Sequence, residues 1–311
     1  MSRSHGPDEF PDPRDTSAEA IPRPQQADRP NSLPEQSPGG DSPEGARLRL
    51  AEPAEPAHPR TGEPRQAFSL RGRTYRLRPS EIRTLSELGK FRAVGISDLR
   101  EFAYQGDRAR AIVDVKNLIR QGLVSARKIP HPETSPRRLL TLTTQGHRLL
   151  LATKRVPKNQ AIHHGFAKPR EAHHDADLYR MYHTAAGKIE RQGGRNLRVI
   201  LDYELKKRVY HDIAKLGSDR ESPTWKKEIA EKHGLQLVRG KIPLPDLRIE
   251  YETCDGEMAR VDLELATEHY RGRNLAEKVR AGFSIYAHAQ DAAGLRRVLD
   301  QRELTAEILS L

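Results

Sequence analysis

Three acidic residues and one lysine in the C-terminal third of the chain have the types and spacing that suit metal-assisted chemistry. Asp246 follows Pro245, Asp262 and Glu264 stand two residues apart in the next apolar stretch, and Lys278 comes after them. Hard carboxylate oxygens at this density bind Mg²⁺ or Mn²⁺ better than zinc. Whether the four residues act together depends on the elements that carry them.

The segment that holds the acidic residues predicts a β-hairpin with a defined register. Apolar residues alternate with polar ones in 247–251 and in 261–265, so one face of the hairpin is buried. A two-residue turn at 255–256 would bury charge among these apolar side chains. A three-residue loop, 254–256, avoids this and gives Gly256 the left-handed third position that such loops need. The predicted pairs are Leu247 with Leu263, and Ile249 with Val261.

This register gathers charge on the other face of the hairpin. It places Asp246 across from Glu264, and Arg248 across from Asp262. Like charges opposed in a sheet are destabilising, so the arrangement calls for a divalent cation, a lysine or a raised pKa. Asp246, Asp262 and Glu264 are therefore candidate ligands of Mg²⁺ or Mn²⁺. The alternative is a solvated polar face on which Arg248 neutralises its neighbours.

A lysine is expected to approach these carboxylates from the next element. A helical pattern runs from 275 to about 290 and places Lys278, Gly282 and Ile285 on one face. Lys278 can then point back at the end of the hairpin. The remaining segment, 295–311, predicts an amphipathic C-terminal helix that closes the domain or mediates a homodimer.

Together, "PD", "D-x-E" and a helical lysine resemble the PD-(D/E)xK nuclease family, with the lysine moved from strand to helix. The resemblance implies a restriction-endonuclease-like α/β domain. Ala266 departs from the family pattern, because it stands where the strand lysine would be. Catalysis would then depend on Lys278. The implied catalytic residues are Asp246, Asp262, Glu264 and Lys278.

Basic charge is concentrated in one segment that precedes this domain. Residues 67–160 carry 20 Lys and Arg against 7 Asp and Glu, whereas residues 161–311 carry 26 against 24 and residues 1–66 carry 8 against 12. A segment with this excess predicts an anionic partner, of which DNA is the leading one.

Residues 67–155 show elements in the order of a winged helix-turn-helix. In the third helix, Ile112 and Ile119 belong to the apolar side together with Val115 and Leu118, and Gly122 ends the helix. "NLIRQGLV" and "LLTLTTQGHRLL" resemble bacterial members of that family. The predicted elements are helices at 80–89, from Ser97, and at 112–122, strands at 123–128 and 137–143, and a helix that starts near 144.

In winged-helix proteins the third helix enters the major groove and the wing lies near phosphates. Arginine pairs with guanine and asparagine with adenine, so this helix is expected to read double-stranded DNA. The alternative is a winged helix that contacts protein. The candidate DNA contacts are Arg108, Arg110, Lys116, Asn117 and Arg120 on the helix, and Arg137 and Arg138 at the wing.

Composition defines the remaining domain limits. Residues 1–66 hold 13 of the 22 prolines and one aromatic residue, Phe10, which predicts a disordered tail. Residues 156–169 read as a polar linker, and residues 170–311 as the nuclease-like domain. The fold class is thus α+β, a winged helix followed by an α/β domain. Further predicted elements are helices at 170–193, 205–215 and 224–233, and a strand at 196–202.

Several functions are disfavoured by what the sequence lacks. There is no apolar run of about 18 residues for a membrane span and no signal peptide, which predicts a cytoplasmic protein. The single cysteine, Cys254, allows no internal disulfide. A phosphate-binding loop of an ATPase is absent. The pairs His163–His164 and His173–His174 lack the spacing of a relaxase metal site.

The whole combination resembles the replication-relaxation family of plasmids and integrative mobile elements. The resemblance spans about residues 70–290 and includes "HHDADLYRMY", "VILDYEL", "PDLRIEYE", "VDLELATEHYRGRNLAEK" and "FSIYA". It implies a DNA-binding accessory protein that assists plasmid replication or mobilisation, with a relaxase or replication initiator as partner. The alternative is a metal-dependent endonuclease acting on DNA. Glu204 matches a further acidic position of the family.

Overall fold

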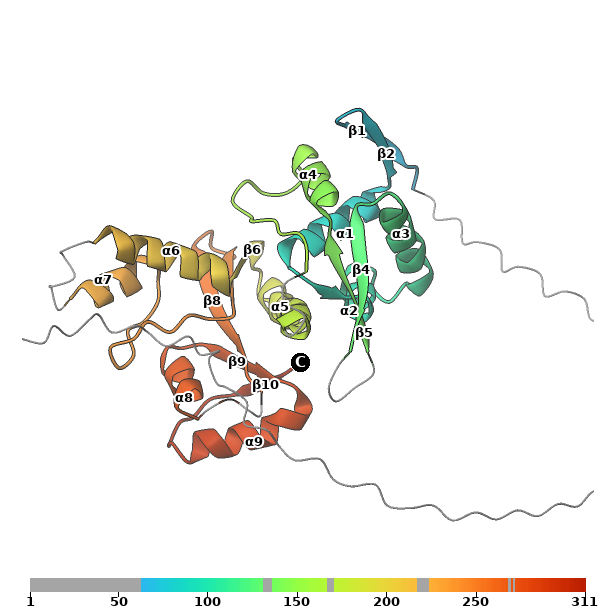
Figure 1. Ribbon diagram of the computed structural model, residues 1–311. Coiled ribbons are helices and arrows are strands. Elements are labelled where there is room, and N and C mark those ends of the chain that lie inside the picture. Colours follow the sequence, from blue (N-terminus) through green and yellow to red (C-terminus); the bar gives the residue numbers. More distant parts are fainter. Residues whose placement is uncertain (1–62, 131–135, 167–170, 217–223, 268–269, 271) are drawn as a thin grey trace, which may run out of the picture. The chain divides into compact units, whose positions relative to one another are not determined.

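The computed structural model describes residues 63–130, 136–166, 171–216, 224–267, 270 and 272–311. The protein is of mixed α and β structure, as the sequence predicts (Figure 1). These described residues belong to one compact unit. In the described part of the chain, no helix has both the length and the apolar character that crossing a membrane requires.

The first half of this unit combines four helices with a three-stranded sheet in the order β3-β5-β4. Asp107 caps α3, because its side chain accepts a hydrogen bond from the backbone N–H of Arg110. Residues 131–135, between the two long strands, lie outside the described residues. The elements are α1 (Pro79–Lys90), β3 (Val94–Gly95), α2 (Ile96–Ala103), α3 (Arg108–Arg120), β4 (Val124–Ile129), β5 (Arg137–Leu142) and α4 (Thr144–Ala152).

A hairpin that the sequence reasoning missed precedes these helices. It consists of β1 (Gln66–Leu70) and β2 (Arg73–Leu77). Tyr75 and Leu77 are fully buried, and Gln121 at the end of α3 exchanges two hydrogen bonds with the backbone of Arg76. β1 therefore begins at the last residue of the predicted tail, and residues 1–62 of that tail lie outside the described residues.

The second half is built on a five-stranded sheet in the order β10-β9-β8-β7-β6. α5 packs on one face and shares its core with strands β6, β7 and β8, while α8 and α9 pack with the other face. The elements are α5 (Ala172–Arg191), β6 (Arg195–Leu201), α6 (Asp202–Lys215), α7 (Trp225–Lys232), β7 (Leu247–Glu252), β8 (Met258–Leu265), α8 (Gly272–Arg280), β9 (Ser284–Ala287), α9 (Ala289–Asp300) and β10 (Ile308–Ser310).

The β7–β8 hairpin has the predicted register. Leu247 pairs with Leu263 and Ile249 with Val261. The N–H of Thr253 donates to the carbonyl of Glu257, which leaves the three-residue loop 254–256. Gly256 adopts φ +82°, the left-handed conformation that the loop requires. The alternating apolar pattern thus determines which residues share a face.

The predicted helix over 275–290 is present only in its first part, which includes Lys278. α8 ends at Arg280, and Gly282, at φ +80°, turns the chain into β9. Ile285 and Tyr286 lie in different cores on the two faces of the sheet, which is the two-residue period of a strand. The predicted C-terminal helix is also only partly present, because α9 ends at Asp300 and 308–310 form β10, parallel to β9.

The predicted linker, 156–169, contains no helix or strand in its described part, 156–166. It is nevertheless held to both halves. The N–H of His163 donates to the carbonyl of Gly89, and the Gln160 side chain forms two hydrogen bonds with the backbone of Val199 in β6. β6 lies at the end of the sheet, so the Gln160 amide occupies part of the position of a further strand.

Candidate functional site

The structure brings Asp246, Glu264 and Lys278 together at one end of the β7–β8 hairpin. Asp246 immediately precedes β7, Glu264 lies near the end of β8, and Lys278 extends from α8. Lys278 Nζ is 2.7 Å from Glu264 Oε1 and donates to the carbonyl of Leu244 at 2.5 Å. The Asp246 N–H donates to Glu264 Oε2 at 3.3 Å. The carboxylate pair that the register predicts therefore exists, with the lysine beside it.

Two further side chains complete this carboxylate cluster, which we define as His174, Asp246, Glu264, Tyr270 and Lys278. His174 Nε2, at the start of α5, is 3.7 Å from Asp246 Oδ1. The Tyr270 hydroxyl donates to Glu264 Oε1. Sequence reasoning missed both, because neither residue is part of a recognised spacing and only the packing of α5 on the hairpin brings His174 near.

The two carboxyl groups have opposite proton affinities. Burial and the charge of Asp246 raise the pKa of Glu264 to about 7, even though Lys278 and Tyr270 act against the shift. Burial also opposes ionisation of Asp246, but the hydrogen bond and charge of His174, together with Lys278, outweigh it and lower the pKa of Asp246. In turn Asp246 raises the pKa of His174 to about 9 against the effect of burial. Near neutral pH the pair therefore carries Asp246 as carboxylate and Glu264 close to half protonated.

Asp262, the third predicted ligand, is held elsewhere. Arg248 lies opposite it and forms a bidentate ion pair, with Nε 2.6 Å and Nη2 2.8 Å from the two Asp262 oxygens. Arg248 is 3% exposed and also donates to the carbonyls of His233 and Gly234. The structure thus gathers two of the three predicted carboxylates, and Arg248 neutralises the third.

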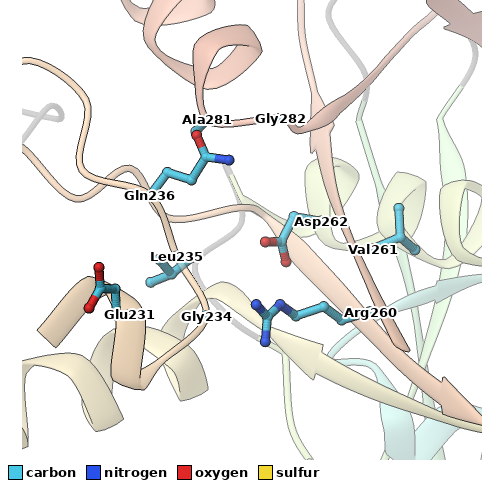
Figure 2. A pocket seen from close by; sticks show the side chains of 9 residues that line it. All are labelled: Glu231, Gly234, Leu235, Gln236, Arg260, Val261, Asp262, Ala281 and Gly282. Carbon is cyan, nitrogen blue, oxygen red and sulfur yellow. The ribbon is translucent and has the colours of Figure 1, made fainter. Parts of the chain in front are cut away.

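A cavity of about 410 Å³ lies beside Asp262 (Figure 2). Arg260 lines it, and among the described residues no acidic group pairs with Arg260. Gly234 makes room for this side chain, because a Cβ at that position would lie 2.0 Å from Arg260 Cζ. The cavity is therefore lined by the cation of Arg260 together with the carboxylates of Glu231 and Asp262.

Asp202, rather than Glu204, is the acidic residue of α6 that lies beside the cluster. The Asp202 N–H donates to the Asp246 carbonyl at 3.0 Å. The Glu204 carboxylate instead lies 3.3 Å from His163 and 3.8 Å from Arg208. Glu204, predicted as a further acidic residue, therefore has a different set of partners from the cluster.

The carboxylate oxygens of the cluster are of the type that binds Mg²⁺, but they already interact with other groups of the protein. Glu264 accepts from Lys278, Tyr270 and the Asp246 backbone, and Asp246 Oδ2 accepts from the Leu265 N–H at 2.9 Å. Within the described ranges, no three His, Cys, Asp or Glu residues are grouped so as to hold a metal ion. Charge compensation comes from Lys278 and His174.

The candidate DNA contacts divide into exposed and engaged side chains. Arg108, Lys116 and Arg120 of α3 and Arg138 of β5 are exposed. Arg120 also donates to the Asn117 side chain at 2.8 Å. These four remain available to an anionic partner.

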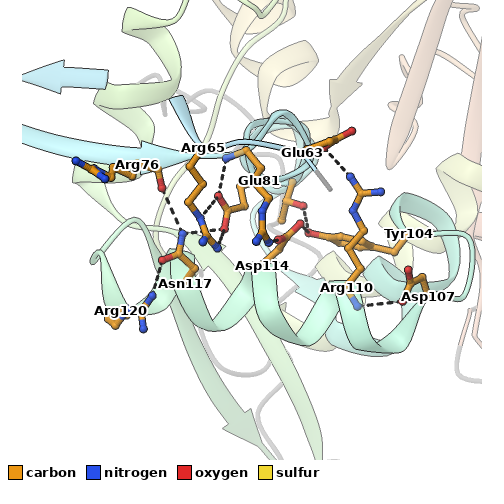
Figure 3. Close-up of polar contacts among 12 residues, drawn as sticks. Glu63, Arg65, Arg76, Glu81, Tyr104, Asp107, Arg110, Asp114, Asn117 and Arg120 are labelled. Atoms are coloured by element: carbon orange, nitrogen blue, oxygen red, sulfur yellow. Dashed lines mark hydrogen bonds and ion pairs between the residues drawn. The ribbon is translucent and has the colours of Figure 1, made fainter. Parts of the chain in front are cut away.

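Two of the predicted DNA contacts, Arg110 and Asn117, face the interior side of α3 (Figure 3). Asn117 is 5% exposed and donates to the buried Glu81 of α1 at 2.7 Å. The guanidinium of Arg110 pairs with Glu63 at 2.7 Å. In this structure both side chains tie α3 to its neighbours.

Arg137, predicted to contact phosphate at the wing, is part of an ion-pair network with α2 and α5. It lies 3.1 Å from Asp98 and 2.6 Å from Asp177. Arg180 of α5 also pairs with Asp98, at 2.6 Å. Arg137 therefore connects the three-stranded sheet to α5.

Basic side chains that the sequence reasoning left out lie next to α3. Arg71, Arg73 and Arg76 of the β1–β2 hairpin are exposed, and Arg73 donates to the Gln121 carbonyl at the end of α3. On its other side α3 contacts β4, which carries two more exposed basic residues. Lys128 and Arg138 pair across the strands on the face of the sheet that packs with α3, whereas Arg127 lies on the other face, over the Phe166 ring. We define the basic surface as Arg71, Arg73, Arg76, Arg108, Lys116, Arg120, Lys128 and Arg138.

Comparison with known protein families and with curated proteins finds no match to this chain.

Proposed function

We propose that the protein binds duplex DNA through the basic surface. The observation that carries the proposal is that these basic residues lie exposed on the β1–β2 hairpin, α3, β4 and β5, while the acidic Glu81, Asp98 and Asp114 of the same half are buried. Phosphate contacts by Lys and Arg supply most of the affinity in such interactions. The order α1, β3, α2, α3, β4, β5, α4 is that of a winged helix-turn-helix, which supports α3 as the helix that enters the major groove.

The sequence resemblance to the replication-relaxation family gives this activity a context. We infer a DNA-binding accessory protein of a mobile genetic element, which assists plasmid replication or relaxase-dependent mobilisation. The partner would be a relaxase or a replication initiator. The second half of the chain would then have a restriction-endonuclease-like fold, an assignment supported by the hairpin register and by the position of Lys278.

The proposal is tested by titrating a fluorescent 30-base-pair duplex with the full chain at several salt concentrations. Affinity is expected to fall steeply as salt rises, because each phosphate contact releases counterions. Lys116→Ala or Arg138→Ala should each weaken binding to any sequence by roughly five- to ten-fold near 0.1 M salt and reduce the salt slope by about one.

Lys227→Ala is the matched control, because it removes an exposed positive charge from α7, outside the basic surface. It should leave binding unchanged. Salt-independent binding, absence of binding, or an equal loss in the control would overturn the proposal.

A second candidate function is a metal-dependent endonuclease, and the proximity of Asp246, Glu264 and Lys278 favours it. Asp246 and Glu264 would hold Mg²⁺ or Mn²⁺, which when bound would polarise a phosphodiester and activate water. The surrounding residues would hold the carboxylates in place and supply positive charge, since Lys278 lies beside Glu264 and Arg260 opens onto the adjacent cavity.

Calorimetric titration with Mn²⁺ tests this second function directly. The wild-type protein should bind one ion per chain, and Asp246→Ala should abolish that binding. Asp262→Ala serves as the comparison variant, because the Asp262 carboxylate is paired with Arg248 and lies outside the carboxylate cluster. No binding by the wild type, or equal binding by Asp246→Ala, would leave the cluster with a structural role and the DNA-binding proposal intact.

A further inference from the structure

Two isoleucines lie exposed on α3, in the middle of the basic surface. Ile112 is 36% exposed and Ile119 is 40% exposed. The sequence pattern predicts both on the inner side of the helix, but Ala111, Val115 and Leu118 occupy that side and are buried. Large apolar side chains in such a position call for a partner that is apolar at those points.

The two isoleucines lie on the same side of the helix at a fixed spacing. They are separated by seven residues, which corresponds to about two turns and roughly 10 Å along the axis. Lys116 lies between them in the sequence and is also exposed. A separation of roughly 10 Å is close to three base-pair steps of about 3.4 Å in B-DNA.

The surroundings favour DNA over a protein partner. Arg108, Lys116 and Arg120 are exposed on α3 with the isoleucines, and Arg73 lies at the end of the helix, where it donates to the Gln121 carbonyl. In the major groove the apolar group that a base presents is the C5-methyl of thymine. An apolar pair within a basic surface therefore matches a groove with phosphates at its rim and methyl groups on its floor.

We propose that Ile112 and Ile119 contact the C5-methyl groups of two thymines about three base pairs apart in the major groove, and so determine sequence preference. This inference rests on the proposed binding of duplex DNA by α3. It is reinforced by Arg110 and Asn117, whose hydrogen-bonding groups are engaged with Glu63 and Glu81. The outward face of α3 therefore recognises the shape of the groove and the thymine methyl groups more than the hydrogen-bonding edges of the bases.

The proposal can be tested without knowing the target sequence. The full chain is titrated with the alternating duplexes poly(dA-dT) and poly(dA-dU), which differ only in the C5-methyl group. Burying a methyl contributes about a four-fold gain in affinity, so the wild type should prefer poly(dA-dT) by roughly four- to fifteen-fold. In poly(dG-dC), methylation of cytosine at C5 should restore part of the gain, because that methyl occupies the same groove position.

Ile112→Ala/Ile119→Ala should bind both duplexes with nearly equal affinity, and Ile112→Val/Ile119→Val should retain most of the preference. The control is Lys116→Ala, which should weaken both duplexes alike and keep their ratio. Equal affinity of the wild type for the two duplexes, with normal salt dependence, would overturn this inference and leave DNA binding standing, whereas no binding to any duplex would overturn both. A double-alanine variant that keeps the preference but dissociates a dimer in sedimentation would assign the isoleucines to a second copy of the chain.

Discussion

We expect Arg248→Met to lower the free energy of unfolding by about 3–5 kcal/mol, because it leaves the Asp262 carboxylate without its partner inside the protein. Arg248 forms the bidentate ion pair with Asp262 and donates to two carbonyls of the loop that follows α7. Methionine preserves most of the side-chain volume but none of these bonds. Urea denaturation followed by circular dichroism measures the change.

The double variant Arg248→Met/Asp262→Leu separates lost charge pairing from lost packing. Removing both charges should restore a large part of the stability, since a buried ion pair replaced by apolar groups of similar volume is often close to neutral. If the double variant is as unstable as the single one, the carbonyls of His233 and Gly234 are the partners that matter. A loss below about 1 kcal/mol in the single variant would contradict the prediction.

The second large effect is expected from Lys278→Met, and it should depend on pH. In the wild type the Lys278 ammonium group lies between Glu264 and the Leu244 carbonyl. The variant removes this positive charge from the vicinity of Asp246 and Glu264. At pH 5 Glu264 is protonated, so the loss should be below about 1 kcal/mol. At pH 8 the wild-type Glu264 has lost its proton with the help of Lys278, whereas in the variant it keeps the proton or ionises beside Asp246 unaided, so the loss should be about 1–1.5 kcal/mol larger than at pH 5.

The sign of this dependence follows from the folded-state pKa of Glu264, which is about 7 against an ordinary value of 4.5. A raised carboxyl pKa gives a contribution to stability that is complete below about pH 4.5 and is lost as pH rises through 7. In the wild type this loss amounts to about 3 kcal/mol. Denaturation is measured in EDTA, so that divalent cations do not contribute.

The interaction of protonated His174 with Asp246 is also lost as pH rises, over the range from 6.5 to about 9. The effect of Glu264 is therefore obtained from the difference in unfolding free energy between variants, rather than from the pH dependence of one protein. Lys278→Met/Glu264→Gln should show a much weaker pH dependence than Lys278→Met. Lys227→Met, on the exposed side of α7, provides a control for the loss of a lysine charge. An equal loss at pH 5 and pH 8 in Lys278→Met would exclude Glu264 as the cause.

The parts of the fold that the sequence predicts well are those where local pattern decides. Alternation of apolar residues in 247–251 and 261–265, with a glycine at 256, leaves one register that buries no charge among apolar groups. The helices of the first half are predictable for a similar reason, because their apolar periods end at glycines and polar turns. The amino-acid pattern alone is therefore enough to place Asp246 and Glu264 side by side.

The errors occur where tertiary contacts outweigh local pattern. The spacing of Lys278, Gly282 and Ile285 fits a helix, but β9 is covered on both faces and such strands show no clear alternation. In α3, a helix with apolar residues around more than half of its circumference, the pattern does not distinguish buried Val115 from exposed Ile112.

Side-chain partners are the least predictable. Arg137 and Asn117 carry the residue types of DNA contacts, yet Asp98 and Asp177 engage the first and Glu81 engages the second. These acidic groups come from elements distant in the sequence, and no spacing rule connects them. His174 enters the carboxylate cluster in the same way, through the packing of α5 on the hairpin.

The hydrogen bonds between the Gln160 amide and β6 affect how readily the sheet pairs with other chains in a crowded solution. A sheet's outermost strand presents unpaired N–H and C=O groups that can recruit a strand from another molecule and start aggregation. Here the N–H and the carbonyl of Val199 are both occupied by one glutamine side chain. A strand from another chain cannot pair there without displacing that amide. The connector that joins the two halves thereby protects the sheet against association with unrelated chains.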